Sequence, residues 1–416
     1  MKELFLFQLV FNLIFLPALY LIQRFWFLKT WHGIRKIKDP LPRKTLEGLC
    51  LATAVLLLLV VIDSSIHIIP RNLAGNLAVS GAMIWFGASA MWLVAVFIYR
   101  ISCRYLITKL PSVSVNVKQV VNPERRLLLR NMGKLGVSLP FIAAAYAAGR
   151  ERLAYHIDRL EIPVAGLPRS LMGLKITHLS DIHMGDFMPL SEVRRIVDLA
   201  NELGGDIAVI TGDFITDHGD PLTECIHELS RLRVPLGIWG CNGNHEIYAD
   251  AEESAKCLFR QNGMRLLRQE SCVVSWRGTG FNLIGVDYQI QGKSELGAML
   301  PGIEMLIRRD MPNILLSHNP NSFYRAAECG IELTLAGHTH GGQVKVEILH
   351  RGFNPAAFFT KFVAGPYKLQ WNQAGSEQDG AGRFFSLYVN RGLGTVKLPI
   401  RWGVPPEIAL LTLVPS

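Results

Sequence analysis

The sequence is poor in cysteine, and its seven cysteines follow no pattern that a disulfide framework or a zinc ribbon would need. Five of them follow residue 150, an odd number, and no two have C-x-x-C spacing. We therefore expect buried free thiols. The sequence also lacks an internal repeat and a long low-complexity tract, although residues 372–382 (NQAGSEQDGAG) predict a loop.

The second part of the sequence lacks an excess of positive charge. The formal net charge is +9, but cations gathered before residue 135 exceed that value. They are Arg24, Lys29, Arg35, Lys36, Lys38, Arg43, Lys44, Arg100, Arg104, Lys109, Lys118, Arg125, Arg126, Arg130 and Lys134. The remainder is mildly acidic and would attract a polyanion poorly, so we expect no nucleic-acid partner.

Long apolar runs dominate the first 150 residues, in a chain that is 50% hydrophobic. The runs are Leu4–Leu21, Leu49–Ile62, Leu77–Tyr99 and the shorter Leu135–Ala148. A helix needs about 20 such residues to cross the hydrocarbon core. We therefore predict a membrane region over residues 1–149 with three or four transmembrane helices, followed by a separate domain over residues 150–416.

The basic loops set the expected orientation, because positively charged loops stay in the cytoplasm. With four spans the domain after residue 150 lies outside the cytoplasm. With three spans it lies inside, and Leu135–Ala148 becomes a soluble or interfacial helix. The pair Arg125 and Arg126 before an apolar stretch also resembles an export signal, which favours the extracytoplasmic location.

Five polar strings in the second domain each follow a short apolar run with strand character. The runs are LKITHL (174–179), DIAVIT (206–211), PLGIWG (235–240), NILLS (313–317) and ELTLA (332–336). The strings after them contribute Asp181, His183, Asp213, Asn244, His318, His338 and His340. Helical spacing between the runs, over residues 190–203, 223–232 and 251–261, indicates an α/β domain. Its strand ends would bring these seven side chains into one crevice.

The types of these residues suit a two-metal hydrolytic centre. In Asp181-x-His183 an extended backbone would send both side chains to the same side, and His338-x-His340 repeats this spacing. Asp213 has two carboxylate oxygens that could bridge ions about 3.5–4 Å apart. Ligands of nitrogen and oxygen without thiolate favour Mn, Fe, Zn or Co.

The order D-x-H, G-D, G-N-H-E, H, G-H-x-H resembles the calcineurin-like metallophosphoesterase superfamily over residues 171–416. The resemblance assigns one metal to Asp181, His183 and His340, the other to Asn244, His318 and His338, and the bridge to Asp213. It makes His245 the catalytic histidine, with Glu246 supporting it. It also implies a two-sheet sandwich flanked by helices, here preceded by the all-α transmembrane region.

Two further strings, GHTHGGQV (337–344) and YVNRGLGTVKLPIRWGVPPEI (388–408), resemble the membrane-attached or exported bacterial subgroup. They predict an integral protein of a bacterial inner or plasma membrane. The expected activity is hydrolysis of a phosphomonoester or phosphodiester, with a lipid-linked phosphoester as the preferred substrate class. Two alternatives stay open: a nuclease or nucleotidase of the same fold, and a metal-stabilised scaffold or sensor without catalysis.

An aromatic segment at residues 349–371 follows the last candidate ligands and contains Phe353, Phe358, Phe359 and Phe362 near two lysines. Such a segment suits an apolar lip beside the crevice, which would contact an amphiphilic phosphoester at a membrane surface. Ordinary packing in the core is the other interpretation.

Overall fold

The computed structural model describes most of the chain after residue 141 and part of the region before it. The described residues are 17, 20–66, scattered positions between 74 and 101, 139, 142–289, 299–348, 351–358, 360–371, 383–396 and 398–416. The chain divides into two compact units, Met1–Tyr146 and Ala147–Ser416, each described here by itself. The loop expected at 372–382 lies outside the described residues.

The first unit contains helices and a small apolar cluster. The longest helix is α2 (Pro40–Ile66), whose Val60 packs with Ala82 and Phe86. The chain is also helical over residues 20–34. Among the residues that the structure describes, no helix combines the length and the apolar character needed to cross a membrane.

The expected transmembrane region is therefore not supported by the described residues. Of the four apolar runs, Leu4–Leu21 and Leu77–Tyr99 fall largely or partly outside them, and Leu49–Ile62 lies within α2. In the run Leu135–Ala148, residue 139 and residues 142–148 are described, all of them helical.

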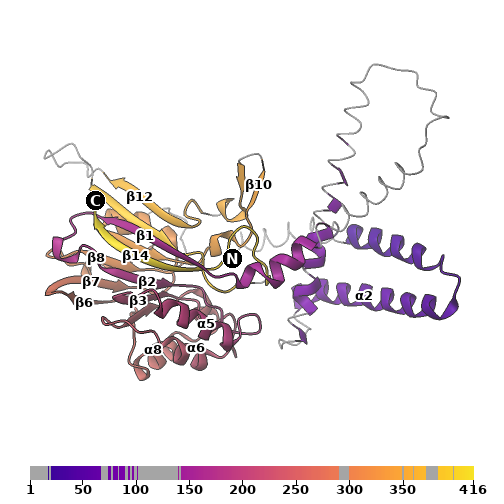
Figure 1. Cartoon of the computed structure of the whole chain (residues 1–416), viewed down its shortest axis with the longest axis horizontal. Coiled ribbons are helices and arrows are strands. Elements are labelled where there is room, and N and C mark those ends of the chain that lie inside the picture. The colour runs from indigo at the N-terminus through magenta and orange to yellow at the C-terminus, as the bar shows by residue number, and fades with distance from the viewer. Residues whose placement is uncertain are drawn as a thin grey trace, which may run out of the picture. The chain divides into compact units, whose positions relative to one another are not determined.

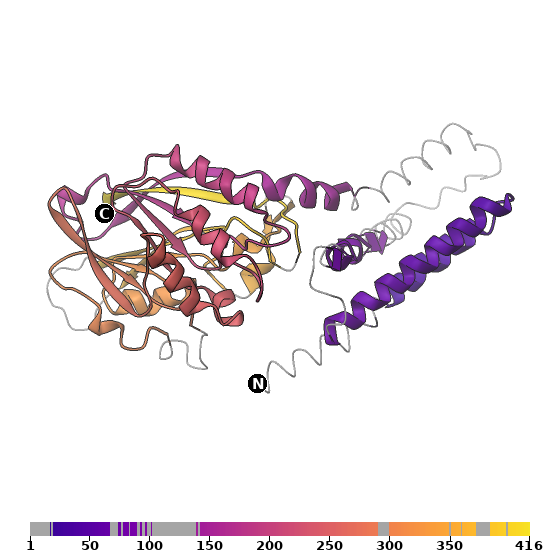
Figure 2. The ribbon, with the colours of Figure 1, turned by 90° about the horizontal axis from the view of Figure 1, so that it is seen from below.

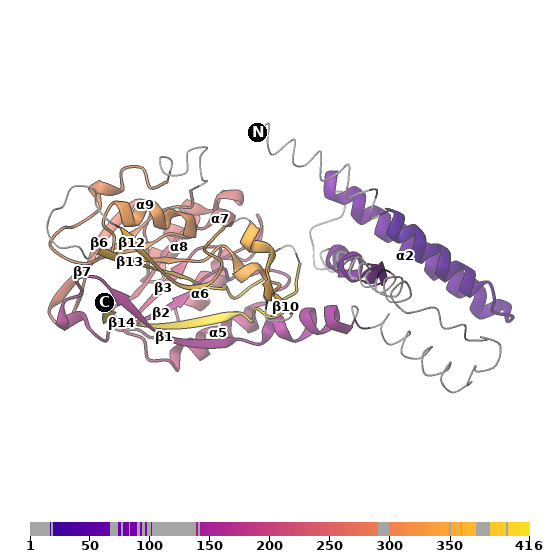
Figure 3. The same ribbon diagram turned by 90° about the horizontal axis from the view of Figure 1, so that it is seen from above.

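The second unit is built on two six-stranded sheets. The first has the order β1-β14-β2-β3-β4-β5, and its inner strands β2, β3 and β4 are parallel. Its strands are β1 (His156–Val164), β14 (Glu407–Pro415), β2 (Lys175–Leu179), β3 (Ile207–Thr211), β4 (Ile238–Cys241) and β5 (Arg265–Leu266). The C-terminal strand β14 pairs in parallel with β1 and antiparallel with β2, as Figures 1 and 3 show.

The second sheet has the order β12-β13-β9-β8-β7-β6, and β13, β9, β8 and β7 are parallel. Its strands are β12 (Gly365–Trp371), β13 (Arg383–Val389), β9 (Leu333–Ala336), β8 (Asn313–Leu316), β7 (Thr279–Gly285) and β6 (Glu270–Trp276). A separate hairpin joins β10 (Val346–Ile348) to β11 (Arg351–Phe353).

Helices cover the outer faces of the sheets. The helices are α5 (Leu190–Asn201), α6 (Leu222–Leu229), α7 (Asn244–Tyr248), α8 (Glu252–Gln261) and α9 (Phe323–Glu328). The short 3-10 helices are η1 (Glu151–Leu153), η2 (Arg169–Leu171), η3 (Ile303–Met305), η4 (Pro320–Ser322), η5 (His340–Gly342) and η6 (Pro355–Phe358). Helices α5, α6 and α8 lie together against the first sheet (Figure 1), and the orange second sheet lies on the opposite side (Figure 2).

The alternation of side chains along each strand explains this layering. In β3, Ala208 and Ile210 pack toward the helices, whereas Ile207 and Val209 pack between the sheets. From the second sheet, Leu316 and Leu335 complete the same inner cluster. The two-sheet α/β fold expected from the sequence is confirmed, and all five apolar runs that precede the polar strings contain strands.

Candidate metal centre

The candidate ligands come from the carboxyl ends of strands in both sheets. The first sheet supplies Asp181 and His183 after β2, Asp213 after β3 and Asn244 after β4. The second sheet supplies His318 after β8, and His338 and His340 after β9. Five strand ends thus bring the candidate ligands together at one edge of the sandwich, and these strands belong to both sheets.

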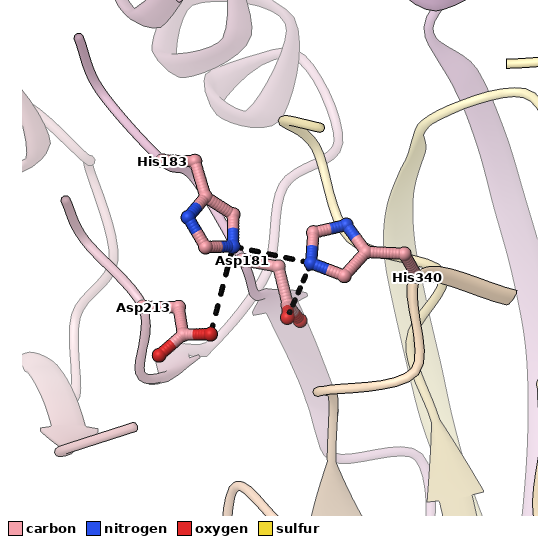
Figure 4. Close-up of side chains that lie close together, drawn as sticks. All are labelled: Asp181, His183, Asp213 and His340. Atoms are coloured by element: carbon pink, nitrogen blue, oxygen red, sulfur yellow. Dashed lines mark hydrogen bonds and ion pairs between the residues drawn. The ribbon is translucent and has the colours of Figure 1, made fainter. Parts of the chain in front are cut away.

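Four of these residues form a buried cluster with their polar atoms facing one another (Figure 4). Asp181, His183, Asp213 and His340 each offer one atom, and all of these atoms lie within 4.8 Å of one another. The Nε2 atoms of His183 and His340 are 3.1 Å apart, and His340 Nε2 lies 3.2 Å from Asp181 Oδ1. His183 Nε2 lies 3.5 Å from Asp213 Oδ2.

The backbone reaches this arrangement in a way that the sequence did not predict. Asp181, His183 and Asp213 have φ values of 51°, 50° and 54°, and His338 and His340 have 74° and 51°. These values lie in the left-handed region, which side-chain-bearing residues rarely occupy. The extended Asp-x-His and His-x-His segments expected from the spacing are therefore wrong. Each of these two segments instead turns sharply at its ligands, and the turns direct the ligand side chains toward one another.

A loop after β13 packs against Asp181 and holds it in place. The amide N–H of Gly394 donates to the Asp181 carbonyl oxygen at 2.7 Å. A Cβ atom on Gly392 would come within 2.7 Å of the Asp181 Cβ atom, so only glycine fits there. The fully buried Arg401 guanidinium donates to the carbonyl oxygens of Arg391, Gly392 and Gly394 and fixes the loop.

The other candidate ligands meet beside this cluster. Asn244 Oδ1 and His338 Nδ1 are 2.9 Å apart, and His318 Nε2 lies 3.1 Å from Asp213 Oδ2. The backbone N–H of His338 donates to both carboxylate oxygens of Asp181, at 3.0 Å each. These contacts link all seven sequence-predicted ligands into one continuous group.

Burial and the two carboxylates set the charges in this group. Burial lowers the pKa of His183 to about 3 and that of His338 to about 4, and it holds the pKa of His340 well below its usual range. Burial also opposes a charged His318, yet Asp213 and Asp181 raise its pKa to about 10. The buried carboxylates thus require positive charge nearby, while three imidazoles stay neutral as metal ligation requires.

His245 and Glu246 occupy the first turn of α7. Glu246 is fully buried and accepts hydrogen bonds from the backbone N–H groups of Gly243, Asp213 and Phe214, each at 2.8 Å. It therefore braces the loops that carry Asp213 and Asn244. His245 Nδ1 lies 2.5 Å from the carbonyl oxygen of Thr216, and its ring centroid lies 4.7 Å from that of His183.

The sequence did not single out Arg401 or Tyr288, although both are part of the site. Arg401 lies within the string at 388–408, but an arginine in a loop carries no signal of burial. Tyr288 follows β7, and its ring centroid lies 5.2 Å from that of His338 and 5.9 Å from that of His318. The one signal in the sequence was that Tyr288 follows a strand, as the candidate ligands do.

The residues fit divalent cations. Ligand distances of about 2.1 Å put neighbouring ligand atoms roughly 3 Å apart. The contacts His183–His340, His340–Asp181 and Asn244–His338, at 3.1, 3.2 and 2.9 Å, match that separation. In addition, His318 Nε2 lies 3.1 Å from Asp213 Oδ2, a similar separation. Such convergence of nitrogen and oxygen atoms is typical of a metal site.

The expected aromatic lip is only partly described. Phe362 is buried and packs against Phe323 and Tyr367, so it belongs to the core. Phe358 is 76% exposed. Phe359 and the side chain of Phe353 lie outside the described residues. Phe362 thus agrees with ordinary core packing, whereas the apolar lip stays a prediction for Phe358.

Comparison with known proteins agrees with this geometry. Residues 174–342 match the family model described as calcineurin-like phosphoesterase. The chain is 27% identical over 298 residues to "Uncharacterized metallophosphoesterase YkuE" of Bacillus subtilis (strain 168), covering 70% of this chain and 97% of that protein. It is 30% identical over 296 residues to "Uncharacterized protein YpbG" of the same organism, covering 67% and 98%.

A vertebrate relative has a similar identity. The "Transmembrane protein with metallophosphoesterase domain" of Danio rerio is 28% identical over 299 residues, which cover 67% of this chain and 62% of the relative. The matched family model includes every candidate ligand, and its description agrees with the His/Asp cluster. The chain belongs to the calcineurin-like metallophosphoesterase family.

Proposed function

We propose that this protein is a metal-dependent phosphoester hydrolase that holds two divalent cations. The observation that carries the proposal is the convergence of Asp181, His183, Asp213 and His340, whose ligand atoms lie within 4.8 Å of one another. A family of phosphoesterases and a buried cluster of this composition favour hydrolysis over a purely structural role.

The two ions would share Asp213. One would be held by Asp181, His183 and His340, and the other by Asn244, His318 and His338. The 2.9 Å contact between Asn244 Oδ1 and His338 Nδ1 supports the second set, because these atoms are spaced like ligands of one ion. The mixture of nitrogen and oxygen ligands favours Mn, Fe, Zn or Co.

Bound divalent cations would acidify a water molecule and offset the charge on phosphoryl oxygens. The chain would supply the remaining steps. Because the Thr216 carbonyl can only accept, His245 Nδ1 is the donor in their contact, and Nε2 remains to carry a proton. His245 would give that proton to the departing oxygen. Glu246 would keep His245 and Asp213 in place through its three backbone hydrogen bonds.

The substrate class that we favour is a lipid-linked phosphoester, reached by a protein attached to a membrane. Several leucines of α2 are exposed, among them Leu49, Leu51 and Leu58, and Phe358 is exposed in the catalytic unit. The name of the Danio rerio relative begins with the words "Transmembrane protein". We propose that residues 1–149 attach the chain to the membrane and that the catalytic domain lies outside the cytoplasm.

The test of hydrolysis uses the full chain, stripped of metal and then supplied with Mn, Zn, Fe or Co. We expect metal-dependent turnover of aryl phosphomonoesters or phosphodiesters, and faster turnover of a lipid-linked ester at equal concentration. A protein that binds metal but turns over none of these esters would instead be a scaffold or sensor. The location is tested with two kinds of reporter fused after Ser416. A reporter that is active only after export should be active, and one that is active only in the cytoplasm should be inactive. Activity of the cytoplasmic reporter would reject the proposed orientation.

A further inference from the structure

Tyr288 lies beside the candidate metal ligands, and the contacts of its neighbours in the chain fix its position. It is half-buried, and its ring packs against the rings of His338 and His318. Both residues belong to the second set of candidate ligands. Tyr288 therefore contacts the second set of candidate ligands directly.

The residues on both sides of Tyr288 anchor its backbone. Asp287 accepts a hydrogen bond from Asn242 Nδ2 at 2.9 Å and forms an ion pair with Arg268 at 2.8 Å. The carbonyl oxygen of Gln289 accepts from Asn319 Nδ2 at 3.0 Å. Asn242 and Asn319 belong to the loops that carry Asn244 and His318. Tyr288 is thus tied to two loops that supply candidate ligands.

The Tyr288 hydroxyl makes no hydrogen bond with any residue that the structure describes. Three tyrosines elsewhere in this unit differ: Tyr155 and Tyr388 donate to Glu192 and Glu407, and the Tyr367 hydroxyl accepts from the Val363 N–H. The O–H group of Tyr288 is therefore available to donate to a bound ligand.

Tyr248 provides a second aromatic surface nearby. It ends α7, is 65% exposed, and its ring centroid lies 5.5 Å from that of His245. One tyrosine thus contacts the candidate ligands, while the other contacts the histidine expected to serve the departing group.

We propose that Tyr288 and Tyr248 form a substrate subsite in which the Tyr288 hydroxyl donates to a phosphoryl oxygen and the Tyr248 ring contacts the organic group attached to phosphorus. This subsite rests on the proposed function, and it narrows the substrate class to phosphoesters whose organic group presents a flat, apolar face beside the phosphorus. Tyr288 recognises the phosphoryl group in every such substrate, whereas Tyr248 discriminates among the organic groups.

The test measures equilibrium binding of methylphosphonate and phenylphosphonate, which are not hydrolysed, to the full chain loaded with Mn. The variants are Tyr288→Phe and Tyr248→Ala. The control is Tyr324→Phe, because the Tyr324 hydroxyl also makes no hydrogen bond within the described part of the chain, while its ring packs against Phe362. Bound Mn per chain and the thermal unfolding midpoint are measured for each protein, and binding is compared among variants that match the wild type in both.

Tyr288→Phe should weaken both phosphonates equally, by roughly tenfold, because it removes one hydrogen bond to a charged oxygen. Tyr248→Ala should leave methylphosphonate unchanged and reduce the preference for phenylphosphonate severalfold. Tyr324→Phe should bind both as the wild type does.

The inference is overturned if Tyr288→Phe binds both ligands normally, if Tyr248→Ala weakens both equally, or if the wild type binds neither. Should Tyr288→Phe or Tyr248→Ala lose Mn or unfold early, that residue supports the structure, and the subsite is rejected. A wild type that binds phosphonates with this pattern but hydrolyses no ester would leave the subsite intact and reject the proposed hydrolysis.

Discussion

The two sets of candidate ligands are built differently. In the inner set, Asp181, His183 and His340 are all buried, and each has a left-handed backbone. In the outer set, Asn244, His318 and His338, only His338 has such a backbone, and it is half-buried beside Tyr288. The inner set is thus fixed by its main chain and closed to solvent. In the outer set, Asn244 and His318 are buried as well, and His338 is the member with partial exposure, so we expect a substrate to approach beside it.

From this difference we infer that the inner set mainly binds metal, whereas the outer set also contacts the substrate. A left-handed conformation costs about 1–3 kcal/mol for a residue with a side chain, and it persists only where the surroundings enforce it. Gly392, Gly394 and Arg401 provide those surroundings for Asp181. We therefore expect disturbance of the inner set to change metal binding first, and disturbance near the outer set to change substrate binding first.

Asp213 joins the two sets, and its replacement should have the largest effect. Asp213→Asn keeps the size of the side chain but removes the charge that faces both His183 and His318. We expect the loss of both metals together and activity no higher than that of metal-free protein, measured by elemental analysis and ester turnover. The surface variant Asp198→Asn is the control. Full metal content with full activity would contradict the bridging assignment.

His245 should separate chemistry from metal binding. His245→Ala should retain both metals and lose roughly 10²–10⁴ in turnover rate, the usual contribution of a positioned proton donor. The exposed His218, replaced by alanine, serves as the control. If His245→Ala loses its metals, the residue is a ligand, and the proposed role is wrong.

A pair of glycines tests whether the backbone holds the inner set. Gly392 and Gly330 both have positive φ, 71° and 88°, so alanine strains either. Only at Gly392 would the new Cβ press on Asp181, since nothing lies within 4 Å at Gly330. Gly392→Ala should weaken the binding of one metal by about 10–100-fold, as supporting residues of metal sites do. Equal metal affinities in the two variants, measured by competition with a chelator, would show that Asp181 needs no such support.

The smallest effect is expected at Phe358. Because it is exposed, Phe358→Ser should change the free energy of unfolding by less than about 0.5 kcal/mol. It should weaken apparent affinity for a lipid-linked ester and leave turnover of a small soluble ester unchanged. Phe362→Ser is the contrasting variant, because a buried phenylalanine contributes about 3–5 kcal/mol. Equal turnover of the lipid-linked ester by wild type and Phe358→Ser would remove this residue from substrate binding.

The sequence predicted the strands that deliver the ligands, because runs such as DIAVIT and NILLS are short, apolar and followed directly by polar strings. The candidate ligands lie in those polar strings, so the sequence predicted them as well. It did not predict the turns at Asp181 and His183, since their conformation depends on Gly392 and Gly394, which lie far away in the chain. Nor did it predict that β14 inserts between β1 and β2, a pairing of strands separated by most of the domain.

The central claim is that the seven ligands hold two cations and that hydrolysis needs both. The most direct test adds Mn in steps to the metal-free full chain and follows bound metal and turnover of an aryl phosphodiester in the same samples. We predict that the inner set fills first with little turnover, and that activity rises with the second equivalent and stops rising at two. Full activity at one equivalent, or none at two, would contradict the two-metal account.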